Sequence, residues 1–183
     1  CVALLEVDES LNLPDFRSGE RTFQLLVQAA GRAGRNKDTG HVYIQTTGGH
    51  NELILKATHH DYEAFIQDEI IFRKRYAYPP FFKLALLEFS SLNENLLENY
   101  TDQLSNWLES YLEKNQEFSQ TLRIQGPYKP GVERINKRWR KHILLRSENP
   151  RQIHELVSLI HENIKKKPSA IRFKIDIDPQ SML

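Results

Sequence analysis

The chain has 183 residues, of which 39% are hydrophobic and 27% charged, with a formal net charge of +1. These proportions indicate a globular protein of one large or two small domains, and no apolar run is long enough to span a bilayer, so we expect no membrane partner. The single cysteine, Cys1, excludes an internal disulfide and a cysteine-based zinc site within this chain, and with no basic-then-apolar leader it favours a reducing cytoplasm.

The first quarter of the chain alternates strand and helix patterns. Val2–Val7 suits a short buried strand, and because it begins with no preamble we expect the chain to be a piece of a longer protein. A helix follows, capped by Asp15 or Ser18. Its apolar stripe has helical spacing and consists of Phe23, Leu26, Val27 and Ala30. Residues 41–46, HVYIQT, predict a second strand, and residues 52–57 predict a short helix.

A further helical pattern runs from Asp61 to about Arg75. Its expected apolar face consists of Tyr62, Phe65, Ile66 and Ile70. The pattern ends at YAYPPF, residues 76–81, where two prolines cannot continue a helix and force the preceding residue into an extended conformation. We expect a domain boundary here.

The rest of the chain follows the order strand, helix, strand, strand, helix, strand. The strand patterns cover Leu84–Ser90, Arg123–Gln125, His142–Leu145 and Ile171–Ile177, and the helical patterns cover Leu96–Leu112 and Ile153–Ile164. In the last strand, apolar residues alternate with charged ones, so one face is expected to be buried and the other wet. The order βαββαβ is that of a ferredoxin-like split βαβ unit, and the fold class we expect is α/β, of the α+β kind.

The stretch QAAGRAGR, residues 28–35, places unusual residues on a helix. One polar face carries Arg21, Gln24, Gln28, Arg32 and Arg35. A solvated surface is the simplest interpretation. Gly31 and Gly34, however, each cost the helix about 1 kcal/mol relative to alanine. They allow another surface to approach the backbone closely, where guanidinium groups can bind phosphate oxygens bidentately.

This stretch resembles the last conserved motif of superfamily 2 helicases, of the form Q-x-x-G-R-x-G-R. Its flanks PDFRSGERTFQLLV, HVYIQT, THHDYEAF and YPPF resemble the PriA family of replication-restart helicases, also called primosomal protein N′. Gly126-Pro127, the run ending WRKHILL and the late DIDP fit the same family in the same order. The resemblance implies the C-terminal part of a second RecA-like lobe at 1–60, a linking helix and boundary at 61–82, and a C-terminal DNA- and partner-binding domain at 83–183.

The resemblance also implies roles within the motif. Arg32 and Arg35 would reach the γ-phosphate of ATP bound between two RecA-like lobes, as arginine fingers, and Gln28 would couple that site to DNA. The alternative is that one arginine only pairs with a neighbouring carboxylate. The parent protein would use ATP and Mg²⁺ and hold zinc in a module outside this segment. Because the sequence has no G-x-x-x-x-G-K-[ST] loop and no Walker B strand, we expect this chain alone to use no cofactor and to neither bind nor hydrolyse ATP.

A basic segment lies in the second half of the chain. Its candidate DNA-binding residues are Lys129, Arg134, Lys137, Arg138, Trp139, Arg140 and Lys141, against one acid, Glu133. Clustered cations with an aromatic residue suit single-stranded or forked DNA, through phosphate pairing and base stacking. The alternative is a solvated hairpin with Trp139 in the core, and for Trp139 both interpretations stay open.

Two weaker features concern partners and metals. The resemblance implies that Arg151 and His154, at the start of the last helix, help to hold the acidic tail of single-stranded DNA-binding protein, and that primosome proteins are further partners. His59-His60-Asp61 has metal-ligating residue types, but adjacent residues face different ways and Asp61 suits a helix cap, so we expect no metal site.

Three functions are consistent with these patterns. The first is the C-terminal fragment of an ATP-dependent 3′-to-5′ DNA helicase that recognises stalled or branched replication forks and promotes primosome assembly and replication restart. The second is a freestanding nucleic-acid-binding or adaptor module. The third is a fragment of an RNA helicase, because the arginine motif occurs in those proteins too. The flanks of the motif favour the first.

Overall fold

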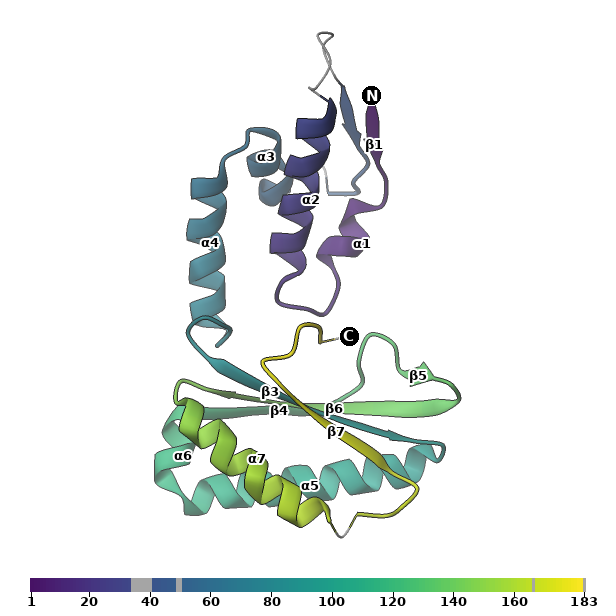
Figure 1. Cartoon of the computed structure of the whole chain (residues 1–183), viewed down its shortest axis with the longest axis vertical. Helices are drawn as coiled ribbons and strands as arrows, with labels where there is room; N and C mark the ends of the chain where they lie inside the picture. Colours follow the sequence, from purple (N-terminus) through teal and green to yellow (C-terminus); the bar gives the residue numbers. More distant parts are fainter. Residues whose placement is uncertain (34–40, 49–50, 166, 183) are drawn as a thin grey trace. The chain divides into compact units, whose positions relative to one another are not determined.

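The structure is a computed structural model that describes residues 1–33, 41–48, 51–165 and 167–182 (Figure 1). The chain divides into two compact units, Cys1–Arg75 and Tyr76–Leu183. The division falls within the segment 61–82 that the sequence assigns to a link, and the helix of that segment belongs to the first unit.

The first unit is a small βαβ arrangement. Its elements are β1 (Val2–Leu4), α1 (Val7–Leu11), α2 (Ser18–Ala33), β2 (Val42–Ile44), α3 (Glu52–Thr58) and α4 (Tyr62–Arg75). Strands β1 and β2 pair in parallel with Val2 opposite Val42, which requires a crossover connection such as the one that contains α2. The buried core is made by Val7, Phe23, Leu26, Ile54, Ala57 and Phe65.

Two features of this unit differ from the sequence-based expectation. Val7 does not extend the first strand but begins α1, whose Asp8 accepts hydrogen bonds from Thr46 Oγ1 at 2.8 Å and from the backbone nitrogen of Thr47. The apolar face predicted for α4 is wrong, because Tyr62 is 59% and Ile70 45% exposed. The buried residue of this helix is Phe65, which stacks on Phe23 with ring centroids 4.1 Å apart.

The second unit is a sheet covered on one face by helices (Figure 1). Its elements are β3 (Lys83–Ser91), α5 (Glu94–Lys114), α6 (Gln116–Thr121), β4 (Leu122–Tyr128), β5 (Arg134–Ile135), β6 (Arg138–Ser147), α7 (Pro150–Ile164) and β7 (Arg172–Ile177). The strand order β4-β6-β3-β7, antiparallel throughout, is that of a split βαβ unit. The predicted order βαββαβ and the α+β class are therefore confirmed.

Alternation along the central strands separates two faces of this sheet. Ala85, Leu87 and Phe89 of β3 point toward the helices and join the core of the unit. The residues between them, such as Glu88 and Ser90, point to the opposite face. The opposite face is covered over much of its length, because Leu84 and Leu86 of β3 and Leu144 of β6 are buried there, whereas Glu88 and Ser90 near one end are partly exposed.

The second unit contains two elements that the sequence patterns did not predict, helix α6 and strand β5. Helix α6 has no fully buried residue and therefore no strong apolar period. Strand β6 begins at Arg138 rather than His142, because its first residues pair with the short strand β5 in a hairpin. That part of β6 is basic rather than apolar, and so it lacked the pattern of a buried strand.

Candidate nucleic-acid interface

The motif on α2 presents its polar residues to solvent. Gln28 and Arg32 are exposed, one turn apart, and Arg32 makes no ion pair with any residue that the structure describes. Arg21, on the same face, pairs with Asp15 at 3.2 Å. A Cβ added at Gly31 would meet no atom within 4 Å. Arg35 lies outside the described residues.

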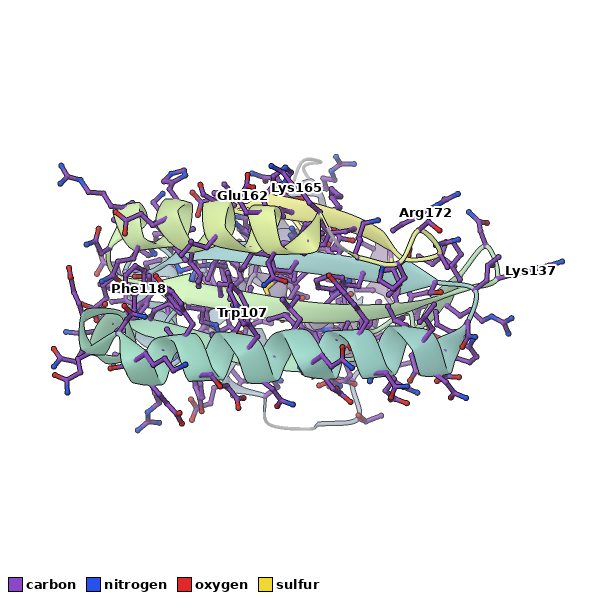
Figure 2. The ribbon with its side chains drawn as sticks, turned by 90° about the horizontal axis from the view of Figure 1, so that it is seen from below. Trp107, Phe118, Lys137, Glu162, Lys165 and Arg172 are labelled. Carbon is purple, nitrogen blue, oxygen red and sulfur yellow. The ribbon has the colours of Figure 1, made fainter. Side chains whose placement is uncertain are left out.

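The basic segment forms a hairpin between β5 and β6. Arg134 pairs with Trp139 and Ile135 with Arg138, which leaves Asn136 and Lys137 as a two-residue turn. Their φ values are 49° and 64°, as a type I′ turn requires. Figure 2 shows the Lys137 side chain extending away from the ribbon at one end of the unit, the end at which Arg172 also lies.

Trp139 lies at the base of this hairpin, on the helix side of the sheet. Its ring is half-buried and packs against the core of the second unit. Two cations flank the same ring, the Arg134 guanidinium at 4.8 Å and the Lys129 ammonium at 5.8 Å from its centroid. The packing of the Trp139 ring therefore anchors the hairpin to the core. The two cations beside the ring add cation–π contacts to this packing.

A groove lies on the face of the sheet opposite the helices, beside the hairpin. Its volume is about 380 Å³. Its lining residues come from β3, β6, β7 and the hairpin, and they are Glu88, Phe89, Ser90, Ile135, Asn136, Arg138, Arg140, Arg172, Phe173 and Lys174. Four of these residues are cationic and one is acidic, so the groove carries excess positive charge.

Arg138 is fixed in the groove by neutral groups. Its Nη2 donates to the backbone oxygens of Ser90 at 2.8 Å and Ala170 at 3.0 Å, and its Nε donates to Ser90 Oγ at 3.3 Å. None of these acceptors carries a charge. The guanidinium is thus held in place while its positive charge is left without a carboxylate partner among these contacts.

Glu88 is the acidic residue in the groove, and it contacts two of the four cations. Its carboxylate accepts from Lys174 Nζ at 2.9 Å and lies 3.4 Å from Arg140 Nη2. Lys174 also pairs with Asp176 at 3.1 Å, and the hydrogen bonds that its ammonium donates to Glu88 and Asp176 raise the pKa of Lys174. Arg140 donates in addition to the backbone oxygen of Val132 at 3.1 Å.

Arg172 is exposed at the start of β7 and makes no ion pair with the described residues. The sequence-based list of DNA-binding residues omits Arg172 and Lys174. The alternation of apolar and charged residues in β7 places both on the wet face, and this pattern is the sequence signal that could have identified them. What the alternation did not show is that β7 lies beside β3 and so adds its cations to those of β6.

Two other predicted residues, Lys129 and Lys141, are engaged by acids. Lys141 Nζ donates to Glu98 on α5 at 2.9 Å, which lowers the pKa of that carboxyl. Lys129 lies 3.2 Å from Glu133 and 3.4 Å from Glu94. Their charges are therefore largely compensated, in contrast to those of Arg138 and Arg172.

His142 lies beneath the groove with a fully buried side chain. Its Nε2 is 3.3 Å from Arg140 Nη2, and its Nδ1 has no hydrogen-bond partner among the described residues. Burial, aided by the Arg140 charge, lowers the pKa of His142 from its ordinary 6.5 to about 4. The ring is therefore neutral at physiological pH and adds no charge to the groove.

The helix side of this unit has the opposite electrostatic character. Helix α5 contains one cation, Lys114, and its acids are Glu94, Glu98, Asp102, Glu109 and Glu113. Helix α5 covers one face of the sheet (Figure 1), and the groove residues Glu88, Arg138 and Arg140 lie on the other face. A polyanion is therefore attracted to the groove side and repelled from the α5 side.

The other predicted site residues lie elsewhere. Arg151 and His154 are exposed on α7, and His154 lines a shallow depression of about 470 Å³ with Tyr111, Glu155, Ser158 and Leu159. Asp61 accepts from the backbone nitrogen of Ala64 at 3.0 Å, as a helix cap does. Among the described residues, no group of three or more His, Cys, Asp or Glu side chains is arranged to hold a metal. Over the same residues, no helix has the length and apolar character to cross a membrane.

Comparison with known proteins identifies relatives along the whole chain. The family model of the primosomal protein N C-terminal domain matches residues 74–180. Similar proteins include the replication restart proteins PriA of Bacillus subtilis, 34% identical over 185 residues, of Synechocystis, 36% over 182, and of Borreliella burgdorferi, 33% over 183. These matches cover 99–100% of this chain.

The same matches cover a much smaller share of the relatives. The aligned part is 22% of the Bacillus protein, 21% of the Synechocystis protein and 26% of the Borreliella protein. The chain thus spans about a fifth to a quarter of the length of the curated relatives it matches. All three relatives are named for replication restart.

Proposed function

Because the chain belongs to the primosomal protein N C-terminal domain family, we propose that it is the C-terminal part of an ATP-dependent 3′-to-5′ DNA helicase acting in replication restart. The parent protein recognises stalled or branched forks and promotes primosome assembly. Within it, the second unit binds forked or single-stranded DNA.

The observation that carries the DNA-binding role is the uncompensated positive charge at the hairpin end of the sheet. Arg138 is held by neutral acceptors, and Lys137 and Arg172 make no ion pair with the described residues. Phosphates that pair with such cations release the counterions of the DNA, and this release supplies most of the affinity of sequence-independent binding. The acidic α5 on the other side of the sheet orients the DNA toward this end.

The first unit takes part in the ATPase of the parent protein under this proposal. Its parallel strand pair with a crossover helix is consistent with the end of a RecA-like lobe. Arg32 and Arg35 supply positive charge to the γ-phosphate of ATP with its Mg²⁺, and Gln28 couples that site to DNA. The exposure of Gln28 and Arg32, one turn apart, supports this role. The phosphate-cradling loop and the zinc module belong to other parts of the parent protein.

Partner binding completes the proposal. Arg151 and His154 contribute to a site for the acidic tail of single-stranded DNA-binding protein, and primosome proteins bind the parent protein as well. Both side chains are exposed on α7, as such a role requires.

The DNA-binding role is tested by fluorescence anisotropy of the chain with a labelled model fork over a series of salt concentrations. The double variant Arg134→Gln, Lys137→Gln removes two exposed cations of the hairpin. We expect it to weaken binding and to reduce the slope of log K against log salt by about 2, one for each phosphate contact. The matched control is Lys114→Gln, an exposed cation at the C-terminal end of α5, which leaves affinity and slope unchanged.

Two results would contradict this role. One is a wild-type chain whose affinity for the fork does not depend on salt. The other is a hairpin variant with the affinity and slope of the Lys114→Gln control, since the hairpin would then make no contact with phosphate.

A further inference from the structure

We infer that the groove on the open sheet face is a binding site for single-stranded DNA, in which Arg138 and Arg172 hold a phosphate and Glu88 limits the affinity. This inference rests on the proposed function, because it assumes that the second unit binds DNA. It adds the form of the DNA, the residues of the site and an attenuating carboxylate.

The cations of the groove converge on Ser90 of β3. In the ladders of the sheet, Ser90 lies opposite Arg140 on β6 and opposite Arg172 on β7. Arg138 reaches the same residue through its hydrogen bonds to Ser90 Oγ and Ser90 O. Directly paired residues of an antiparallel sheet have Cβ atoms about 4.5–5.5 Å apart, so the side chains of Arg140 and Arg172 leave the sheet beside the residue that the Arg138 guanidinium contacts.

Arg138 is suited to hold a phosphate at this point because its position is fixed before any ligand arrives. Its Nε and Nη2 are occupied by neutral acceptors, and Nη1 makes no hydrogen bond with the described residues. Arg172 faces the same groove without an ion-pair partner in the described structure. A phosphate between them receives charge-assisted hydrogen bonds at little entropic cost to Arg138.

The size of the groove favours a single strand over a duplex. At about 380 Å³ it lies near the lower end of pockets that enclose small ligands, a scale that suits a nucleotide. Its walls include the hairpin residues Ile135 and Asn136. A duplex presents its phosphates on a wide, convex surface with its bases stacked inside, so it can place a phosphate at the rim but no base in the groove.

The walls also offer an apolar surface for a base. Ile135 is 45% exposed and lines the groove. Guanidinium planes, such as that of Arg172, stack on bases as well. Every base has a flat apolar face, so contacts of this kind tolerate any sequence. A protein that acts at forks of any sequence needs this property.

Glu88 opposes binding in this site. It is the acid among the described lining residues, and it pairs with Arg140 and Lys174. Its carboxylate therefore competes with phosphate for two cations and repels the incoming strand. Removal of that charge ends this competition at Arg140 and Lys174 and removes the repulsion of phosphate, so the affinity rises.

The test uses the full chain and two labelled ligands of equal length, a thymidine 20-mer and a blunt duplex, in anisotropy titrations. We expect Arg172→Gln to weaken binding of the 20-mer roughly tenfold, as loss of a charge-assisted hydrogen bond does, and to weaken duplex binding less. Glu88→Gln should tighten binding of the 20-mer by about threefold or more and steepen its salt dependence. Lys114→Gln is again the matched control.

Arg172 is exposed, so its replacement leaves the fold intact, and a thermal melt of each variant verifies that the Glu88 variant is folded. Equal losses for the 20-mer and the duplex with Arg172→Gln overturn the single-strand site. So does weaker binding by a folded Glu88→Gln variant. The hairpin variant Arg134→Gln, Lys137→Gln separates these failures from a failure of the proposed function. If that variant still loses fork affinity, the groove inference is overturned but the proposed function stands. If the hairpin and groove variants all bind as wild type does, both proposals fail.

Discussion

The two units of the chain present their arginines in different ways. In the first unit, Arg32 is exposed on α2 next to Gly31, where an added Cβ would meet no atom within 4 Å. In the second unit, Arg138 and Arg172 lie in a groove whose floor and walls come from three strands and a hairpin of the same unit. An arginine on one surface can serve a ligand that a second surface holds, whereas an arginine in a groove can hold the ligand itself.

The cores of the two units also differ, and the second unit has the larger sheet and the larger core. The sheet of the first unit has two strands of three residues each, and the sheet of the second unit has central strands of nine and ten. The larger sheet is covered by two long helices and encloses a core of leucine, isoleucine and phenylalanine side chains. The second unit therefore has the means to keep its site in shape without help from other parts of the parent protein.

The largest effect that tests this comparison concerns Arg32. In the full-length helicase that we propose, Arg32→Lys should lower DNA-stimulated ATP turnover about a thousandfold, because lysine cannot reproduce the bidentate charge of an arginine finger. Steady-state turnover and DNA affinity are measured together, with Arg134→Gln as the control that affects DNA affinity alone. A loss of DNA affinity equal to the loss of turnover would mean that Arg32 serves DNA rather than ATP.

The next effect separates the stabilities of the two cores. Both tryptophans, Trp107 and Trp139, lie in the second unit, so their fluorescence reports its unfolding. Leu87→Ala, in a fully buried position of β3, should lower the free energy of unfolding of this unit by about 2–5 kcal/mol in urea titrations. Leu92→Ala, at a position 65% exposed, should change it by less than about 0.5 kcal/mol.

The matching variant in the first unit is Phe65→Ala, which removes the ring stacked on Phe23. If the two units unfold independently, this variant leaves the tryptophan-detected midpoint in place while the far-UV circular dichroism transition broadens. A shift of the tryptophan midpoint comparable with that of Leu87→Ala would show that the units share their stability.

A smaller effect concerns one glycine in each unit. Gly126 has φ +114°, and a Cβ there would lie 2.6 Å from the backbone oxygen of His142. Gly126→Ala should therefore destabilise the second unit by about 2–3 kcal/mol. Gly31 lies within α2 with open space around it, so Gly31→Ala should stabilise the first unit by about 0.5–1 kcal/mol.

Thermal unfolding of the isolated chain by circular dichroism measures both glycine variants. In the full-length parent protein, a fall in ATP turnover with Gly31→Ala would support the interpretation that this glycine allows a second surface to approach. Unchanged turnover would show that the glycine has no such role and only weakens the helix.

The smallest effect is a pH dependence confined to the second unit. The pKa of His142 is 6.5 in the unfolded chain and about 4 in the folded one, so the unfolded state binds the proton more tightly. The contribution of His142 to stability is complete above pH 6.5 and is lost as the pH falls toward 4. Between pH 7.5 and pH 5 the loss is about 2 kcal/mol. It should disappear in His142→Phe and persist in His154→Gln, an exposed histidine on α7.

Much of the fold of the second unit could be predicted from its sequence, because its strands and helices have strong apolar periods. Leu84–Leu87 is a continuous apolar run that is buried on both faces, and the helix through Leu104 and Leu108 buries one continuous face. The hairpin β5–β6 could not be predicted in this way. Its strands are held by a two-residue turn and by Trp139 rather than by an apolar stripe, and the turn sequence Asn-Lys lacks the glycine typical of such turns.

The candidate site could be predicted in part. The excess of cations between Lys129 and Lys141 marked the region, but their individual states depend on residues far away in the sequence. Lys141 is compensated by Glu98, and Arg140 by Glu88, through contacts that only the strand and helix packing creates. Arg172 joins the groove because β7 lies next to β3, a neighbour relation that composition does not contain.

The turn at Asn136 and Lys137 has a consequence for how this sequence can change. Both residues adopt left-handed backbone conformations, which glycine adopts at lower cost than lysine does. Selection for stability alone would place glycine at position 137, and selection for charge would retain the lysine. Under the proposed function, lysine at this position is a compromise between folding and DNA binding, and stabilising substitutions at this tip would be gained at the expense of its charge.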